Sequence, residues 1–209
     1  LISVVAFFWR DWLSLIYSAL RRDGTQEERL FWYLVVATIP GAAMGYLFEE
    51  QAETIFRTPL LIGTLLIVMG ILLYWVDRRA ASVKDIQNLS LFGSLLIGLS
   101  QAFAIIPGVS RSGATMTAGR AIGLTREAAA RFSFLLSTPI IVGAGVFKLK
   151  DITPGDINAA FITGVVASAV VGFISIGFLL RYLARHSFGV FAWYRFIVGS
   201  AVIIIALLR

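Results

Sequence analysis

The chain of 209 residues has no cysteine and a single histidine, and only 14% of its residues are charged. The absence of cysteine excludes disulfide bonds, thiolate catalysis and cysteine-ligated metal sites. A soluble domain carries about a quarter charged residues, so the shortage of charge argues against a soluble protein. The start of the chain has no basic segment leading into a short apolar stretch with a small-residue cleavage site, so no cleavable signal peptide is predicted.

Hydrophobic residues are abundant instead, at 58% of the chain. They gather in long runs, and this composition predicts a multi-spanning membrane protein. The net charge of +6 does not indicate nucleic-acid binding. The basic residues lie in short loops between apolar runs, where the positive-inside rule places them, and form no stripe interleaved with aromatic residues.

Five apolar runs are near the length that a helix needs to cross the hydrocarbon core, about 20 residues. They lack the alternation of a strand, and a lipid-embedded backbone must satisfy its hydrogen bonds within helices or a closed barrel. We therefore expect an all-α fold, a polytopic membrane helix bundle that forms a single transmembrane domain over residues 1–209. The predicted spans are Leu30–Phe48, Pro59–Val76, Ala128–Val146, Ile157–Leu180 and Val190–Leu208.

The first residues predict an incomplete helix. The chain starts with Leu1 and not with methionine, and the apolar run Leu1–Trp9 is too short to cross a bilayer. We expect the chain to begin inside a transmembrane helix, with its natural N-terminal part missing. The following segment, Arg10–Arg22, mixes charged residues with Trp, Leu, Ile and Tyr, which is typical of an interfacial amphipathic helix.

The segment Ser90–Gly123 interrupts the pattern of spans. Its apolar part stops at Pro107-Gly108, where proline cannot continue a helix and glycine frees the backbone. We expect a re-entrant helix-loop-helix over about 90–123; a single kinked helix is the alternative. If this segment enters and leaves on one side, most basic residues fall on that side, which is then cytoplasmic. The basic residues left for the other side are Arg57, Lys148, Lys150 and Arg209.

The middle of this hairpin, Ile106–Thr115, reads I-P-G-V-S-R-S-G-A-T and places an arginine where lipid-like residues are expected. An ionisable residue inside a membrane marks a functional site by default. If the second half-helix starts just after Val109, Ser110 is its N-cap, and the free amides of the next three residues form an anion site. Arg111 adds a planar guanidinium that grips phosphate oxygens through two hydrogen bonds.

Three neighbouring residues complete this hypothesis. Thr115 lies four residues after Arg111 and shares its helix face, while Gly108 and Gly113 would let a bulky ligand approach the backbone closely. The alternative is purely structural: Ser110 caps the helix, the glycines pack against other helices, and Thr115 bonds back to its own helix. This alternative leaves Arg111 unexplained, so the sequence favours an anion site.

The motif P-G-V-S-R-S-G-A-T, preceded by Gln101, resembles the signature of bacterial undecaprenyl-diphosphate phosphatases, integral-membrane enzymes of the bacitracin-resistance type. The resemblance covers essentially the whole chain in span order. It implies hydrolysis of undecaprenyl diphosphate to undecaprenyl phosphate and inorganic phosphate, which recycles the lipid carrier for cell-wall synthesis in the bacterial inner (plasma) membrane. It also implies two inverted repeats, each with a re-entrant hairpin. The other matching segments are F-F-W-R at Phe7–Arg10, R-F-S-F-L-L-S-T-P at Arg131–Pro139 and W-Y-R-F-I-V at Trp193–Val198.

The resemblance also assigns roles to residues of the hairpin loop. It implies Ser110, Arg111 and Thr115 as catalytic residues and, together with Ser112 and Gly113, as ligands of the diphosphate. It further implies a divalent metal ion, Mg or Ca, whose ligands we do not expect within this chain.

The acidic motif of the family has no counterpart in the sequence. That motif pairs two glutamates four residues apart with a serine-rich loop that contains histidine. Glu49 and Glu53 have this spacing, but no such loop follows them, so we interpret them as unrelated. His186 lies in a basic loop and is interpreted as an interfacial residue. A chain without the acidic motif is expected to be inactive, and Ser110 has no nearby base that would make it a nucleophile.

Other functions are weighed against hydrolysis. A transporter or flippase would bind a phosphorylated lipid or another anion at a midplane site without hydrolysing it, whereas a structural membrane subunit would leave Arg111 unexplained. The expected partners are a polyprenyl diphosphate lipid and the bilayer, with no nucleic acid, and a homodimer is left open. Arg131 and Arg195 stay outside the predicted site: Arg131 could snorkel to the interface, and Arg195 could line the cavity or pair with a lipid headgroup.

Overall fold

The computed structural model describes residues 1–151 and 153–208, although not the side chains of Glu49, Glu53 and Pro154. The interpretation of these two glutamates therefore lies outside the described side chains. Regular structure in the described part is helical, apart from an isolated bridge between Lys84 and Leu124. The helices are α1 (Ile2–Arg21), α2 (Gln26–Leu47), α3 (Glu49–Glu53), α4 (Pro59–Arg79), α5 (Leu91–Ala102), α6 (Arg111–Ala121), α7 (Arg126–Leu149), α8 (Ala159–Leu183) and α9 (Gly189–Leu207).

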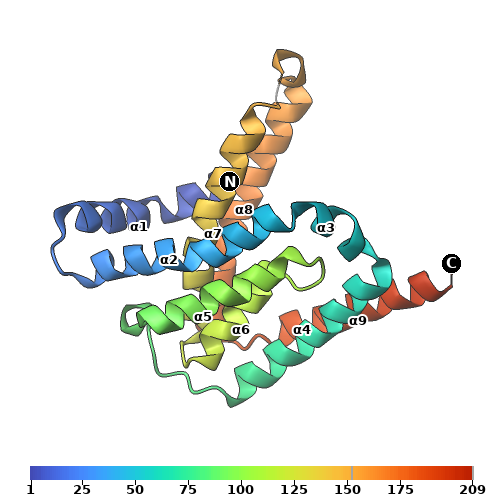
Figure 1. The fold of residues 1–209 in the computed structure, drawn as a ribbon, viewed down its shortest axis with the longest axis horizontal. Helices are drawn as coiled ribbons and strands as arrows, with labels where there is room; N and C mark the ends of the chain where they lie inside the picture. Colours follow the sequence, from blue (N-terminus) through green and yellow to red (C-terminus); the bar gives the residue numbers. More distant parts are fainter. Residues whose placement is uncertain (152, 209) are drawn as a thin grey trace.

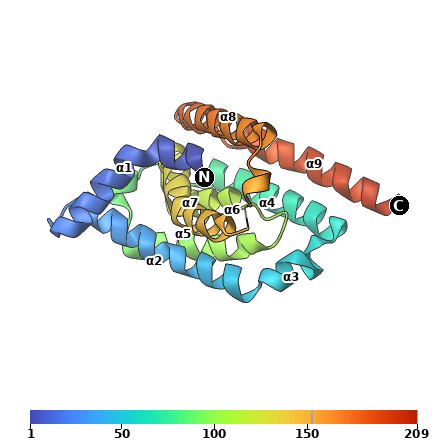
Figure 2. The same cartoon turned by 90° about the horizontal axis from the view of Figure 1, so that it is seen from above.

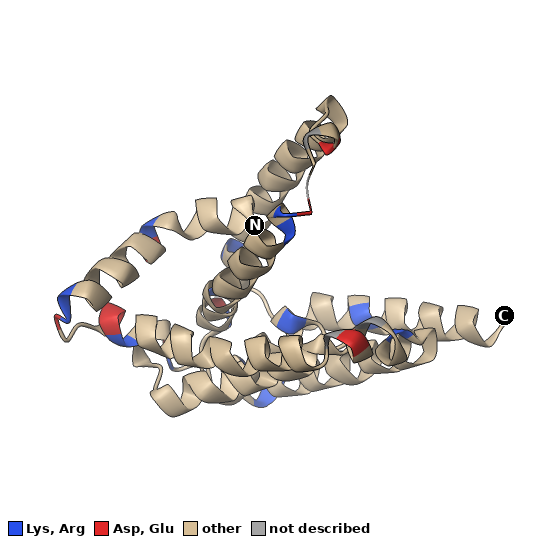
Figure 3. Cartoon of the chain, turned by 45° about the horizontal axis from the view of Figure 1, so that its top comes forward, with Lys and Arg blue, Asp and Glu red and all other residues tan. Residues whose placement is uncertain are grey.

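The five predicted spans are confirmed as α2, α4, α7, α8 and α9, which are long and apolar enough to cross a membrane. Their bounds extend beyond some of the apolar runs because capping residues start the helices earlier; Thr25, for example, accepts a hydrogen bond from Glu28 N–H before α2. Charged residues lie mainly at helix ends and in loops, and the long segments between them are largely uncharged (Figure 3). The chain is a multi-pass, all-α membrane protein.

The N-terminal segment is divided by a kink that lies close to the predicted boundary. α1 spans 20 residues, and the run Leu1–Trp9 and the segment Arg10–Arg22 lie largely on either side of its kink. It bends at Phe8, whose φ of −101° and ψ of 16° are not helical. The Phe8 ring is buried and packs against Phe7 and Phe134. The kink therefore lies where the Phe8 ring enters the core.

The segment 90–123 folds as a helical hairpin, so the alternative of a single kinked helix is wrong. α5 begins after Ser90, whose hydroxyl accepts from Gly93 N–H, and ends in the short helix η3 (Phe103–Ile105). α6 then returns beside α5 (Figure 1). With 12 and 11 residues, α5 and α6 are about 18 and 16 Å long, roughly half of the hydrocarbon thickness. Neither can cross a membrane alone, as a re-entrant hairpin requires.

A buried ion pair anchors the base of the hairpin. Arg120, near the end of α6, is 1% exposed, and its Nε donates to Asp77 Oδ1 of α4 at 2.9 Å. Its other N–H groups donate to Ser82 Oγ and to surrounding backbone carbonyls. Asp77 also accepts from Arg126 Nε at 2.8 Å and from Phe188 N–H at 3.1 Å. Arg120 is thus not a free loop charge, because it joins α6 to the ends of α4, α7 and α9.

Small residues bring α9 close to α4, and the two helices run antiparallel (Figure 1). A Cβ added to Gly63 would lie 2.6 Å from Ile203 Cγ1, and one added to Gly70 would lie 2.8 Å from Phe196 Cε1. Close approach through small residues is the usual way in which membrane helices pack. The hairpin is enclosed between α2 on the side of α5 and α4 and α7 on the side of α6 (Figure 2).

Candidate active site at the tip of the hairpin

The loop before α6 ends at Ser110, which is the predicted N-cap. Its hydroxyl accepts from Gly113 N–H at 3.3 Å, and α6 begins at Arg111. The Ser110 backbone has φ 62° and ψ 116°, a conformation that a residue with a Cβ rarely adopts and that costs about 1–3 kcal/mol. Strain of this kind is concentrated at functional sites. The loop geometry therefore supports a role beyond connecting two helices.

The first turn of α6 presents several groups suited to an anion. The amides of Arg111 and Ser112 have no acceptor within their own helix, because they occupy its first turn. Ser112 is exposed, and its Oγ lies 3.5 Å from Ser110 Oγ. Within the described residues, the half-buried Arg111 side chain makes no hydrogen bond or ion pair with the protein. Its guanidinium is therefore available to a ligand.

A second arginine reaches the same loop from α9. Arg195 is 8% exposed, and its Nη1 donates to Val109 O at 3.3 Å. A Cβ added to Gly113 would lie 2.1 Å from Arg195 Nη2, so the guanidinium packs directly against the first turn of α6. Arg195 was not included in the predicted site. The available signals were a lone charge within a span and the W-Y-R-F-I-V segment, but neither says which loop Arg195 contacts.

Thr115 lies on the predicted helix face, but its hydroxyl contacts protein atoms. Its Oγ1 lies 2.9 Å from Arg111 O and 2.7 Å from Ser133 Oγ of α7, and the residue is 1% exposed. Part of the structural alternative thus applies to Thr115, which bonds back to its own helix. Direct contact between Thr115 and a diphosphate stays a prediction, and the observed contacts fix α6 against α7.

The two glycines of the loop face protein neighbours. Gly108 has φ +97°, and a Cβ there would lie 2.6 Å from Ile62 O of α4. The space beside Gly113 is taken by Arg195. The expectation that these glycines admit a bulky ligand is therefore corrected: they admit α4 and α9 to the hairpin tip.

Gln101, which precedes the motif at the end of α5, is buried against α2. Its amide nitrogen would lie 2.6 Å from a Cβ added to Gly41. Neither polar atom of the Gln101 amide has a hydrogen-bond partner among the described residues. Gln101 thus marks the contact between the hairpin and α2.

The described side chains form no cluster of carboxylates and histidine. In the described part of the chain, no three His, Cys, Asp or Glu residues lie close enough together to hold a metal ion. The exposed His186 stacks on Tyr182, with ring centroids 4.3 Å apart, and its Nδ1 lies 3.1 Å from Tyr182 O. These contacts fit its interpretation as an interfacial residue.

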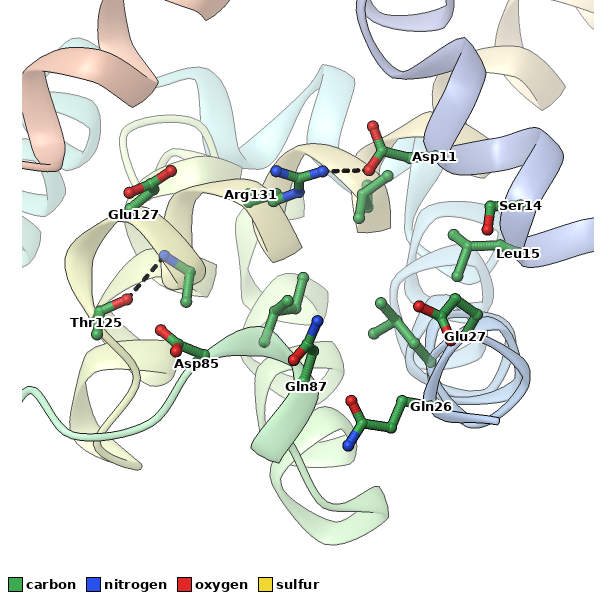
Figure 4. Close-up of a pocket in the computed structure, with 14 residues that line it drawn as sticks. Asp11, Ser14, Leu15, Gln26, Glu27, Asp85, Gln87, Thr125, Glu127 and Arg131 are labelled. Carbon is green, nitrogen blue, oxygen red and sulfur yellow. Dashed lines mark hydrogen bonds and ion pairs between the residues drawn. The ribbon is translucent and has the colours of Figure 1, made fainter. Parts of the chain in front are cut away.

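A cavity of about 400 Å³ lies away from the loop, among α1, α2, η2 (Ile86–Asn88) and α7. Figure 4 shows Arg131 extending across it to an ion pair with Asp11. Other polar residues of its lining include Asp85 and Glu127, whereas none of the residues 106–115 contributes to it. Arg131 therefore serves this cavity and not the hairpin tip.

Together, the fold and the site define a polytopic all-α membrane protein with a candidate anion site at the tip of a helical hairpin. The chain belongs to the BacA family: the family model described as Bacitracin resistance protein BacA matches residues 1–201.

Several relatives that match the whole chain share a name. A protein of Pelotomaculum thermopropionicum named undecaprenyl-diphosphatase is 72% identical over 209 residues, which cover 100% of this chain and 79% of that protein. Proteins of the same name from Desulforudis audaxviator and Moorella thermoacetica are 54% and 53% identical, again over 100% of this chain and 80% of each relative. The chain thus spans about four fifths of the length of these relatives.

Proposed function

We propose that this protein hydrolyses undecaprenyl diphosphate to undecaprenyl phosphate and inorganic phosphate and so recycles a lipid carrier for cell-wall synthesis. Membership of the BacA family and the names of close relatives support this activity. The observation that carries the site assignment is the Arg111 guanidinium, which has no partner among the described residues and lies at a capped helix N-terminus that Arg195 also contacts. No specific observation favours transport of a phosphorylated lipid.

In this proposal, the loop holds the diphosphate and stabilises the charge of the reacting group. The free amides of the first turn of α6 and the hydroxyls of Ser110 and Ser112 donate to phosphate oxygens. The Arg111 fork binds two oxygens of the terminal phosphoryl group, which passes to water as its bond to the bridging oxygen breaks. Arg195 holds the loop through Val109 O and adds positive charge. Undecaprenyl phosphate leaves with the bridging oxygen.

A requirement for Mg or Ca remains part of the proposal through the family resemblance alone. The described side chains do not supply a metal donor set, so they do not fit a resident metal ion by themselves. We therefore derive no step through a metal. Loss of phosphate release in EDTA, with recovery on adding Mg or Ca, would support the requirement.

Two further proposals concern the setting of the enzyme. The multi-pass helical fold suits the bacterial inner membrane, where the lipid substrate resides. A homodimer is also proposed, and its test is the mass of the detergent-solubilised protein at several protein concentrations.

The decisive experiment measures phosphate release from undecaprenyl diphosphate by the purified, intact protein. We expect Arg111→Ala to lower kcat/KM by about 100-fold or more, since it removes charge stabilisation from the transition state. Arg111→Lys should lose about tenfold or more, because a point charge does not replace the bidentate fork. Arg181→Ala, at an exposed position of α8, is the matched control and should retain activity. Unchanged release by Arg111→Ala would refute the site assignment.

A further inference from the structure

The side of α6 that faces α7 carries a chain of buried hydroxyl groups. Thr115 Oγ1 lies 2.7 Å from Ser133 Oγ, 2.9 Å from Arg111 O and 3.3 Å from Ser112 O. Thr115 is 1% exposed and Ser133 is 4% exposed. Water therefore cannot readily replace these contacts, and each hydroxyl hydrogen needs an acceptor within the protein.

The number of hydroxyl hydrogens fixes which group donates in each of these hydrogen bonds. A hydroxyl donates one hydrogen, and the carbonyl oxygens of Arg111 and Ser112 only accept. Within the described residues, the only hydrogen-bond partner of Ser133 Oγ is Thr115 Oγ1. If Thr115 donated to Ser133, the hydrogen of Ser133 would be buried without an acceptor. Ser133 therefore donates to Thr115, and Thr115 donates to Arg111 O.

Large apolar side chains contribute little to the packing of α6. Its sequence R-S-G-A-T-M-T-A-G-R-A has one large apolar residue, Met116, among glycine, alanine and short polar residues. Arg120 and its ion pair with Asp77 hold the far end of the helix. At the loop end, the polar contacts that hold the helix are Arg195 on one side and the Ser133–Thr115 pair on the other.

We propose that Ser133 is a positioning residue for the diphosphate site. Through Thr115 it holds the Arg111 carbonyl and thereby sets the direction in which the first turn of α6 presents its amides and the Arg111 guanidinium. This inference rests on the proposed function. It concerns a residue of α7 that need not touch the substrate.

The matched control lies one turn further along α7. Ser137 is 5% exposed and Ser133 is 4% exposed, but the Ser137 hydroxyl donates to Phe134 O within its own helix, and no hydrogen bond joins it to α6 among the described residues. We expect Ser133→Ala to lower kcat by about 5- to 100-fold, the effect of one lost buried hydrogen bond. KM should change less than kcat, because the lost contact orients the groups that act on the reacting phosphoryl group. Ser137→Ala should behave like the unmodified protein.

A double-mutant cycle distinguishes positioning from a general loss of packing. Thr115→Val keeps the shape of the side chain but removes its hydroxyl, so it should cause a loss comparable to that of Ser133→Ala. Adding Ser133→Ala to Thr115→Val should lower kcat little further, since the hydrogen bond between the two hydroxyls is already lost. The proposal would be overturned if Ser133→Ala and Ser137→Ala lost equal activity, or if Ser133→Ala kept full activity. It would also be overturned if the effects of Ser133→Ala and Thr115→Val on kcat were independent. If Ser133→Ala does not fold, Ser133→Cys, whose thiol is a weaker donor than a hydroxyl, should still lower kcat, and full activity of that variant would overturn the proposal.

A binding measurement separates this inference from the proposed hydrolysis. Inorganic diphosphate should raise the thermal unfolding temperature of the unmodified protein, because it binds the folded state only. The shift should be smaller for Ser133→Ala and unchanged for Ser137→Ala. Absence of phosphate release by the unmodified protein would overturn the hydrolysis alone, whereas equal shifts for both serine variants would overturn the positioning role.

Discussion

At the scale of single residues, the contact of Arg195 with the hairpin gives a sharp test of the site. Arg195→Ala removes a buried guanidinium next to the first turn of α6, and we expect kcat/KM to fall by about 10- to 100-fold, as for other charged hydrogen bonds. Arg195→Lys should recover only part of this loss, because lysine lacks the planar fork. Phosphate release and thermal unfolding should be measured together. A stably folded, fully active Arg195→Ala protein would contradict the role of this residue.

A substitution at Gly113 tests the same contact by displacing the Arg195 side chain without removing its charge. A Cβ at this position would lie 2.1 Å from Arg195 Nη2, so Gly113→Ala must displace the guanidinium, although alanine favours helix formation. We expect a loss of phosphate release comparable to that of Arg195→Ala. The control is Gly164→Ala in α8, where an added Cβ meets nothing within 4 Å. If both alanine variants keep full activity, the packing of Arg195 on Gly113 is not required for phosphate release.

The chemistry of the loop could be predicted from local sequence, but its distant partners could not. Ser110 as the cap and the start of α6 follow from local helix chemistry, and both are confirmed. Arg195 and Ser133 contact the loop from α9 and α7, and one sequence contains no signal for which helices meet. The same limit explains why Gly113 was interpreted as space for a ligand when it is space for Arg195.

At the scale of elements, the ion pair between Asp77 and Arg120 holds the hairpin on α4. Asp77→Ala leaves the buried Arg120 without a counter-charge, and we expect the stability of the fold to fall by about 3–5 kcal/mol. The measurement is thermal or denaturant unfolding in detergent. Arg126→Ala, which removes a partly exposed partner of the same carboxylate, should cost less. Equal stability losses for the two variants would show that burial of this pair does not matter.

The elements themselves were largely predictable because lipid imposes a simple rule on their composition. A run of about 20 apolar residues becomes a spanning helix, and α2, α4, α7, α8 and α9 follow that rule. Pro107 and Gly108 likewise marked the turn of the hairpin. The kink of α1 at Phe8 also lies next to the predicted boundary between Leu1–Trp9 and Arg10–Arg22, although the contact of the Phe8 ring with Phe134 could not be predicted from the sequence.

At the scale of the whole molecule, both ends of the hairpin should lie on the cytoplasmic side of the membrane. Arg120 ties the end of α6 to the same end of α4 that leads into α5, while Gly108 at the tip packs on Ile62 near the other end of α4. Because the chain has no cysteine, single cysteines can report the side of each loop. Asp85 precedes the hairpin, Glu127 follows it, and both are exposed.

We expect Asp85→Cys and Glu127→Cys to resist a membrane-impermeant thiol reagent in spheroplasts and to react after lysis. Asp151→Cys, in the loop between α7 and α8, should react without lysis, since α7 carries the chain to the other side. The unmodified cysteine-free protein is the background control. If Asp85→Cys and Glu127→Cys reacted from opposite sides, the segment 90–123 would cross the membrane and could not be re-entrant. If Asp151→Cys were the protected position, the whole molecule would have the opposite orientation, and the arginine-rich loops would face outward against the positive-inside rule.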